Sequence, residues 1–287
     1  GNTTTRTMYY NSTVSGAVRI SAGFNDGGRG LSRVLFTDPD GAMGGWPLGA
    51  ISDDVDRKLR PYEAVMSWNI GATVSAVTQA QAYDLTCETP CAPVGNGPTN
   101  LPYTITPDAI APTGGTIEVR RDGPACPTVL ANGDYFGASV CVQRSGAITD
   151  ATSGVDLARA RYERRESNLV SGTCDPMGLT WAIVPGTGFN PPASIEDTST
   201  LNGKCYEYRY AVPDRVSNWH YVTNGVIIRK DTDLPSGAID PIVPNPSSGM
   251  VTVSGFAQDP SSGVAYVHIQ YDGPDPGTVP DANWCPG

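Results

Sequence analysis

The chain has 287 residues, a formal net charge of -10 and only 17% charged residues, a length that suits two or three modules of about 100 residues each. An acidic surface repels phosphate backbones, which argues against general nucleic-acid binding. The 33 glycines and 25 prolines suit many short strands joined by turns and do not suit a helical bundle.

Membrane insertion is not expected for this segment. No apolar run approaches the roughly 20 residues that a spanning helix needs. The first residues, Gly1-Asn2-Thr3, are neither basic nor followed by an apolar stretch, so they do not form a signal peptide. We therefore expect a mature product or a fragment. The one plausible helix, near residues 53–60, could equally be a loop.

One turn motif occurs three times along the chain. Its copies span residues 22–31, 146–155 and 255–264. Each copy has a strand end, an aspartate-led turn, a glycine and then a strand of alternating apolar residues. The leading aspartates are Asp26, Asp150 and Asp259. Aspartate caps such turns by accepting hydrogen bonds from nearby amides, and glycine takes positive φ without penalty. The repetition indicates internal duplication.

A tyrosine-rich hairpin follows the second copy. Tyr206, Tyr208 and Tyr210 alternate with polar residues, which predicts a strand with one face on a core. Asp214 leads a turn, and a second strand is expected near residues 221–229. A proline-containing linker, 231–235, then ends the hairpin, because proline has no amide hydrogen to donate. In the first module Asp84 takes the place of Asp214.

The linkers set the expected domains. Residues 107–113 match 230–236, so the chain divides into tandem units. The expected segments are 1–11, a strand of a preceding repeat or a donated strand, then 12–109, 110–233 and an incomplete 234–287. Landmarks about 110–130 residues apart fit one antiparallel β-sandwich each. The predicted fold class is all-β.

These motifs resemble the bacterial Ig-like repeats of large secreted and cell-surface proteins. The second unit carries the resemblance in Asp150 with 153–155, the tyrosine strand, Asp214-Arg215 with Asn218, and Asp231-Thr232 with Pro235. The third unit carries its first half, and the first unit departs at Gly27-Gly28-Arg29-Gly30. The resemblance implies tandem Ig-like sandwiches and a secreted or cell-surface location.

Disulfides are the expected use of the cysteines. The spacings contain no pair of CxxC knuckles, and His220 and His268 are the only histidines, so zinc is a poor interpretation. The expected pairs are Cys126 with Cys141, Cys174 with Cys205, and Cys87 with Cys91. From its strand parity we expect Cys205 to hold its bridge outside the main core. Cys285 is left unpaired, or pairs between molecules. Free buried thiols are the alternative.

Calcium is the strongest chemical alternative to simple turn capping. Hard cations bind several oxygen ligands from loops. Asp108, Asp231 and Asp233 lie in the linkers, where an ion would stiffen the joint, while Asp150, Asp214 and Asp259 lie at turns. Ordinary capping explains all of these aspartates without a metal. No other cofactor is expected.

A structural or adhesive role is expected rather than catalysis. The two histidines lie in different units, so the sequence offers few candidates for a nucleophile paired with a histidine base. We expect a stalk, spacer or filament segment whose partners are neighbouring repeats, with self-association by strand exchange as a variant. The alternatives are an adhesin module that binds a glycan or protein through loops 42–56 or 87–100, and an accessory region of a secreted enzyme. The five tryptophans are expected in cores or interfaces rather than as a sugar platform.

Overall fold

The computed structural model of the protein describes residues 6–24, 31–41, 43–53, 61–84, 98–121, 128–242 and 252–269. Within these ranges the regular structure is β-strand, apart from one short 3-10 helix, Leu157–Arg159. The all-β fold class is therefore confirmed. No helix in the described ranges is long and apolar enough to cross a membrane.

The chain forms two compact units. The first contains residues 1–113 with the segments 148–156 and 213–220, and the second contains 114–147, 157–212 and 221–287. This division differs from the expected segments. Residues 148–156 and 213–220, which were expected in the 110–233 unit, belong to the first unit, and the residues after 233 belong to the second unit.

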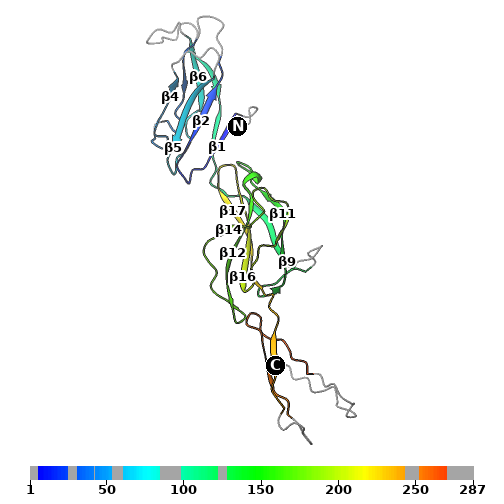
Figure 1. The fold of residues 1–287 in the computed structure, drawn as a ribbon. Coiled ribbons are helices and arrows are strands. Elements are labelled where there is room, and N and C mark those ends of the chain that lie inside the picture. The colour runs from blue at the N-terminus through cyan, green and yellow to red at the C-terminus, as the bar shows by residue number, and fades with distance from the viewer. Residues whose placement is uncertain are drawn as a thin grey trace. The chain divides into compact units, whose positions relative to one another are not determined.

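Among the described residues, the first unit has eight strands, several of which are labelled in Figure 1. They are β1 (Thr7–Tyr10), β2 (Gly16–Ala22), β3 (Leu31–Phe36), β4 (Ile51–Asp53), β5 (Tyr62–Trp68), β6 (Gln79–Asp84), β7 (Thr99–Pro102) and β8 (Thr104–Pro107). β2 pairs with β5, while β4, β3, β6 and β7 form a second sheet in that order. The alternation of strand side chains explains the core, since Tyr62, Ala64 and Met66 of β5 are buried while Val65 is exposed.

The N-terminal strand completes the first unit. β1 pairs in parallel with β8, with Thr7 opposite Thr104 and Tyr10 opposite Pro107. Tyr10 lies in the core of the same unit and donates a 2.6 Å hydrogen bond to the carbonyl of Ala72. Its ring meets Trp46 edge-on at 5.2 Å. In this structure, therefore, the segment expected to be a strand of a preceding repeat or a donated strand pairs with a strand of its own chain.

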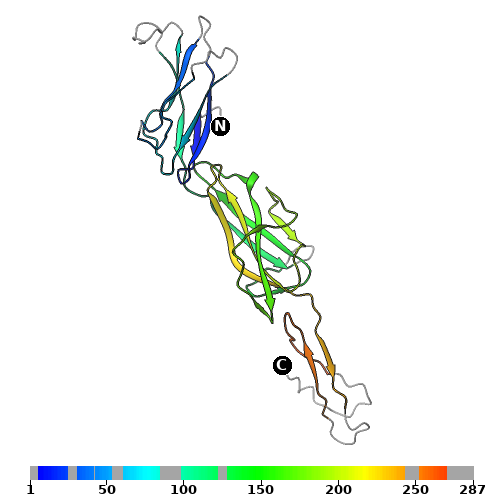
Figure 2. The same ribbon diagram turned by 60° about the vertical axis from the view of Figure 1, so that its left-hand side comes forward.

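Nine strands of the described residues, each with most of its length in the second unit, build the second sandwich. They are β9 (Thr113–Arg121), β10 (Tyr135–Phe136), β11 (Val140–Thr149), β12 (Arg161–Val170), β13 (Thr173–Cys174), β14 (Ala182–Ile183), β15 (Ser194–Asp197), β16 (Lys204–Pro213) and β17 (Trp219–Lys230). One sheet has the order β10-β17-β16-β12-β13, with β14 beside β12, and the other has β15-β11-β9. Figure 2 shows these strands in green and yellow.

The tyrosine strand is the centre of this sandwich, as the sequence predicts. Tyr206, Tyr208 and Tyr210 of β16 are all buried, and β16 pairs antiparallel with β12 so that Tyr210 lies opposite Tyr162. Their ring centroids are 5.0 Å apart. Alternating tyrosines therefore supply much of the apolar area of the core.

The predicted Cys174–Cys205 disulfide is confirmed, with a Cα–Cα distance of 5.9 Å. Its position differs from the expectation, because Cys205 has an exposed fraction of 0%. Glu207, on the same strand parity, is also buried, since Arg165 covers it with an ion pair of 2.6 Å. Both faces of β16 are therefore shielded from solvent.

A two-stranded sheet follows in the second unit. β18 (Ser236–Ile239) pairs antiparallel with β19 (Gly255–Gln258), and the described side chains of both strands are exposed. These are the orange strands of Figure 2. Residues 264–269, where the sequence predicts an alternating strand, have no strand assignment.

Candidate metal centre at three turn aspartates

The turn at Asp150 is closed by its own side chain. Oδ1 of Asp150 accepts hydrogen bonds from the amides of Thr152, at 3.0 Å, and Gly154, at 2.7 Å. Gly154 has a φ of 82°, in the left-handed region that glycine enters without a steric penalty. The Asp-to-Gly spacing in the sequence is therefore the local cause of this turn.

The turn at Asp214 is built in the same way. Oδ1 of Asp214 accepts hydrogen bonds from the amides of Val216 and Asn218, both at 2.8 Å. Oδ2 accepts a third, from the Asn218 side chain, at 2.7 Å. Asp214 has an exposed fraction of 0%, so a fully buried aspartate directly follows β16.

Asp108 reaches the same place from the end of β8. Its Oδ1 accepts a hydrogen bond from the amide of Ile110 at 3.1 Å, and its Oδ2 accepts one from the amide of Ser153 at 3.0 Å. Its exposed fraction is 2%. The Asn218 side chain also donates to the Asp108 carbonyl at 3.1 Å. Asp108 is thus tied to both aspartate-led turns.

Three carboxylates meet as a result. Asp108, Asp150 and Asp214, all residues of the first unit, each offer an oxygen atom, and these atoms lie within 4.8 Å of one another. At an effective dielectric constant of about 20, two full charges at that distance repel by roughly 3 kcal/mol. An arrangement that gathers three such groups, two of them buried, favours a bound cation.

One further polar atom is buried beside them. The hydroxyl oxygen of Ser153 has no hydrogen-bond partner among the described residues, and Ser153 has an exposed fraction of 3%. The amide of Ser153 bonds Asp108 and the next amide, of Gly154, bonds Asp150. The Cβ of Ser153, which carries the hydroxyl, is two bonds from the amide nitrogen that bonds Asp108. The hydroxyl therefore lies close to the Asp108 carboxylate.

The other aspartates singled out in the sequence lie elsewhere. Oδ1 of Asp231 accepts a hydrogen bond from the amide of Asp233, and Oδ2 of Asp233 accepts one from the Ser261 hydroxyl. Asp259 accepts hydrogen bonds from the amides of Ser261 and Ser262. Asp26 and the side chain of Asp84 lie outside the described residues. Of the linker aspartates, only Asp108 belongs to the three-carboxylate group.

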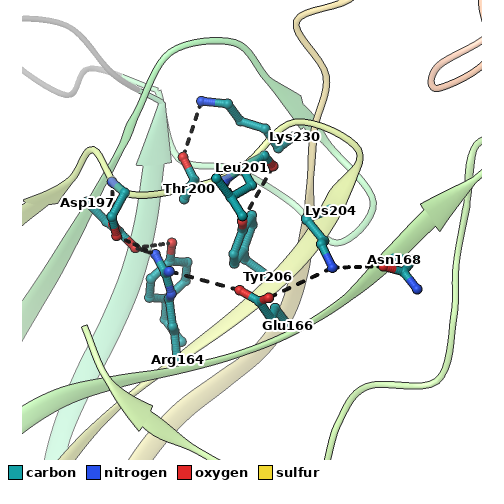
Figure 3. Close-up of polar contacts among 11 residues, drawn as sticks. Arg164, Glu166, Asn168, Asp197, Thr200, Leu201, Lys204, Tyr206 and Lys230 are labelled. Carbon is teal, nitrogen blue, oxygen red and sulfur yellow. Dashed lines mark hydrogen bonds and ion pairs between the residues drawn. The ribbon is translucent and has the colours of Figure 1, made fainter. Parts of the chain in front are cut away.

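A second cluster of charged groups lies in the core of the second unit (Figure 3). Arg164 donates to Oδ2 of Asp197 at 2.5 Å, and the Tyr208 hydroxyl donates to the same oxygen at 2.9 Å. Burial acts to raise the pKa of Asp197, but hydrogen bonds from Ser199, Arg164 and Tyr208 outweigh it and lower the pKa. Burial raises the pKa of Tyr208 well above its ordinary value. The aspartate is therefore kept ionised and the tyrosine neutral.

Two neighbouring contacts in Figure 3 hold the chain at the start of β16. The Tyr206 hydroxyl accepts a hydrogen bond from the amide of Leu201 at 2.6 Å. The buried Lys230 ammonium donates to the hydroxyl of Thr200 at 3.2 Å and to the carbonyl of Ala138. A tyrosine bonded to backbone a few residues upstream is typical of sandwich corners. These groups are engaged in holding the fold together.

The remaining cysteine predictions fall partly outside the described residues. Cys141 is disulfide-bonded, and its partner is not among the described cysteines, which are otherwise Cys174 and Cys205. Cys87, Cys91, Cys126 and Cys285 all lie outside the described ranges, so their pairing stays a prediction.

No protein-family model and no curated protein matches this chain. Among solved structures, fibronectin(III)-like modules of Clostridium thermocellum CbhA match with 14% identity and a TM-score of 0.31, covering 80% of this chain and 93% of that one. A likeness of this strength carries no argument about function.

Proposed function

We propose that the chain is a structural or adhesive repeat segment of a large extracellular bacterial protein, acting as a stalk, spacer or filament part. The observation that carries the proposal is the repeated turn. Asp150 and Asp259 each accept the amide two residues ahead, at 3.0 and 2.9 Å. Each turn ends in a glycine with nearly the same φ, 82° at Gly154 and 80° at Gly263. Duplicated turns support duplicated modules.

The covalent and polar bracing of the second unit supports an extracellular load-bearing role. The Cys174–Cys205 disulfide ties β13 to β16, and disulfides persist in oxidising compartments. The core tyrosines and the Arg164–Asp197 pair add hydrogen bonds that join β12 and β16 to β15 and to the residue before it. Neighbouring repeats are the proposed partners. Self-association by strand exchange stays a prediction; in this structure β1 pairs with β8 of the same chain.

Force spectroscopy on the full chain tests the mechanical part of the proposal. The two cysteines of the disulfide are 31 residues apart in the sequence. While the bond is intact, the segment between them cannot be stretched. Reduction is expected to lengthen the extended second unit by roughly 100 Å, at about 3.3–3.6 Å per residue. Unfolding at forces indistinguishable from those of an unstructured chain would contradict a load-bearing role.

A glycan array separates the spacer from the adhesin. The expected result is that the purified chain retains no glycan, with a known carbohydrate-binding module as the positive control. Retention of one glycan class, competed by the same free sugar, would replace the spacer with a ligand-binding module.

A further inference from the structure

We propose that Asp108, Asp150 and Asp214 bind one calcium ion together with the hydroxyl of Ser153. The inference stands independently of the proposed extracellular role, because it depends only on the first unit. The three carboxylates come from residues 42 and 64 positions apart, by subtraction of their numbers, and reach one place through the turns described above. The site is thus built by the fold rather than by a local run of acidic residues.

The spacing of the oxygen atoms fits a single cation. Oxygen ligands lie about 2.3–2.6 Å from calcium, so two ligands of one ion can be no more than about 5.2 Å apart. The carboxylate oxygens of Asp108, Asp150 and Asp214 lie within 4.8 Å of one another. One ion can therefore contact all three without rearrangement of the turns.

Each carboxylate is oriented before an ion arrives. Backbone amides bond Oδ1 of Asp150, both oxygens of Asp108 and Oδ1 of Asp214. Oδ1 of Asp150 and Oδ1 of Asp214 each accept two amides, which fixes the orientation of both groups. Each oxygen of Asp108 accepts one amide, and since a carboxylate oxygen has two lone pairs, these oxygens keep acceptor capacity for a cation. Oriented ligands reduce the entropy that binding must otherwise overcome.

Ser153 is the independent indication of a ligand. Buried hydroxyls are nearly always hydrogen-bonded, yet the Ser153 oxygen has no partner in the described part of the chain. It is buried, with its own amide on Asp108 and the following amide on Asp150. A cation held by those carboxylates would contact an oxygen in this position and account for the missing partner.

The chemistry of the donors favours calcium over other metals. All the candidate ligands are oxygen atoms, which suit hard cations, whereas zinc and copper favour nitrogen and sulfur. Magnesium loses its water reluctantly and is seldom bound by several protein ligands at once. A group of three carboxylates, two of them buried, together with a buried hydroxyl is better matched by calcium.

Isothermal titration of the full chain with calcium chloride, after removal of metal with EDTA, is the direct test. We expect one ion bound per chain at about pH 7, and a tenfold excess of magnesium, chosen as a rough competitor, should leave binding in place. Absence of binding, or equal binding of magnesium, would overturn the assignment.

Asp150→Asn and Asp259→Asn form a matched pair of variants. Asparagine can accept the same amide hydrogen bonds in a turn, so both turns should keep their shape while losing a charge. We expect Asp150→Asn to weaken calcium binding by about tenfold or more. Asp259→Asn, on an equivalent turn that lies beside Asp233 but outside the three-carboxylate group, should leave it unchanged. Equal effects of the two substitutions would count against the site.

Ser153→Ala provides a second variant that tests the hydroxyl itself. It removes a single oxygen atom and leaves the backbone amide that bonds Asp108. We expect calcium affinity to fall severalfold while the melting temperature measured in EDTA stays the same or rises, because an unpartnered buried hydroxyl is removed. Unchanged affinity would exclude Ser153 as a ligand.

Discussion

The hydroxyl of Tyr208 donates a 2.9 Å hydrogen bond to Oδ2 of Asp197, and both side chains have an exposed fraction of 0%. The same oxygen accepts a hydrogen bond from Arg164, while Oδ1 is bonded by the Ser199 hydroxyl and amide. A charge buried among so many donors is stabilised only while its partners remain. The cluster therefore identifies side chains whose loss should be felt throughout the second unit.

Replacing Asp197 tests how much the buried pair matters. Asp197→Ala leaves the Arg164 guanidinium without its carboxylate, and breaking a buried pair in this way typically costs about 3–5 kcal/mol. The half-exposed pair of Arg120 and Glu118, 2.7 Å apart, is the control, since Glu118→Gln should cost less than about 1 kcal/mol. Urea denaturation followed by circular dichroism measures both. Equal losses would show that burial does not amplify this interaction.

Acid should destabilise the second unit through Asp197. Its pKa is lowered in the folded state although burial opposes this, because Ser199, Arg164 and Tyr208 donate hydrogen bonds to the carboxylate. The unfolded chain then binds the proton more tightly, so this stabilisation is present above the unfolded pKa of about 3.9 and lost as pH falls through the lower folded value.

The measurement is the free energy of unfolding at a series of pH values below about 5. In the Asp197→Asn variant, the free energy of unfolding of the second unit should fall less steeply as the pH is lowered, because the titrating group is gone. A decline as steep as that of the unchanged protein would assign the acid sensitivity to other carboxylates.

High pH should destabilise the folded protein by ionising its buried tyrosines. Burial raises the pKa of Tyr103 and of Tyr162 to about 12. A raised folded pKa means that stability is fully present below the unfolded value of about 10 and is lost as pH rises toward the folded value. Tyrosinate absorbance should therefore rise in two steps, with the buried side chains ionising only near unfolding. A single step near pH 10, as expected in concentrated guanidinium chloride, would contradict this.

The corner at Tyr206 should contribute a measurable share of stability. Tyr206→Phe removes the acceptor of the Leu201 amide, a 2.6 Å hydrogen bond, and should cost about 1–2 kcal/mol. Tyr266→Phe is the control, because Tyr266 has an exposed fraction of 74% and its change should stay within about 0.5 kcal/mol. Thermal denaturation measures both variants. Equal losses of stability in the two would show that water replaces the hydrogen bond between Tyr206 and the Leu201 amide.

Local patterns in the sequence predict the tyrosine strand and the aspartate turns well. Alternation predicts the buried face of Tyr206, Tyr208 and Tyr210, but it does not predict that Cys205 and Glu207 are buried on the other face. That second burial depends on Arg165 and on the disulfide, which are contacts between distant parts of the chain.

The three-carboxylate group shows a similar limit of sequence-based prediction. The sequence identifies Asp108, Asp150 and Asp214 as separate turn or linker residues, and it ranks Asp231 and Asp233 beside Asp108 as calcium candidates. Only the folded topology shows which of these residues share a place. The unpartnered Ser153 oxygen is also invisible in sequence, because every serine of a turn has the same donors and acceptors.

Removal of the Cys174–Cys205 disulfide should destabilise the second unit by about 3–4 kcal/mol, the chain-entropy estimate for a loop of this length. The double substitution Cys174→Ala with Cys205→Ala avoids leaving a lone thiol in the buried position of Cys205. Thermal denaturation with and without reductant measures the effect. The unchanged protein should lose stability on reduction, and the double variant should lose only what its other disulfides contribute. An equal response to reductant in both proteins would assign the stabilisation to a bond elsewhere, such as the one that Cys141 forms.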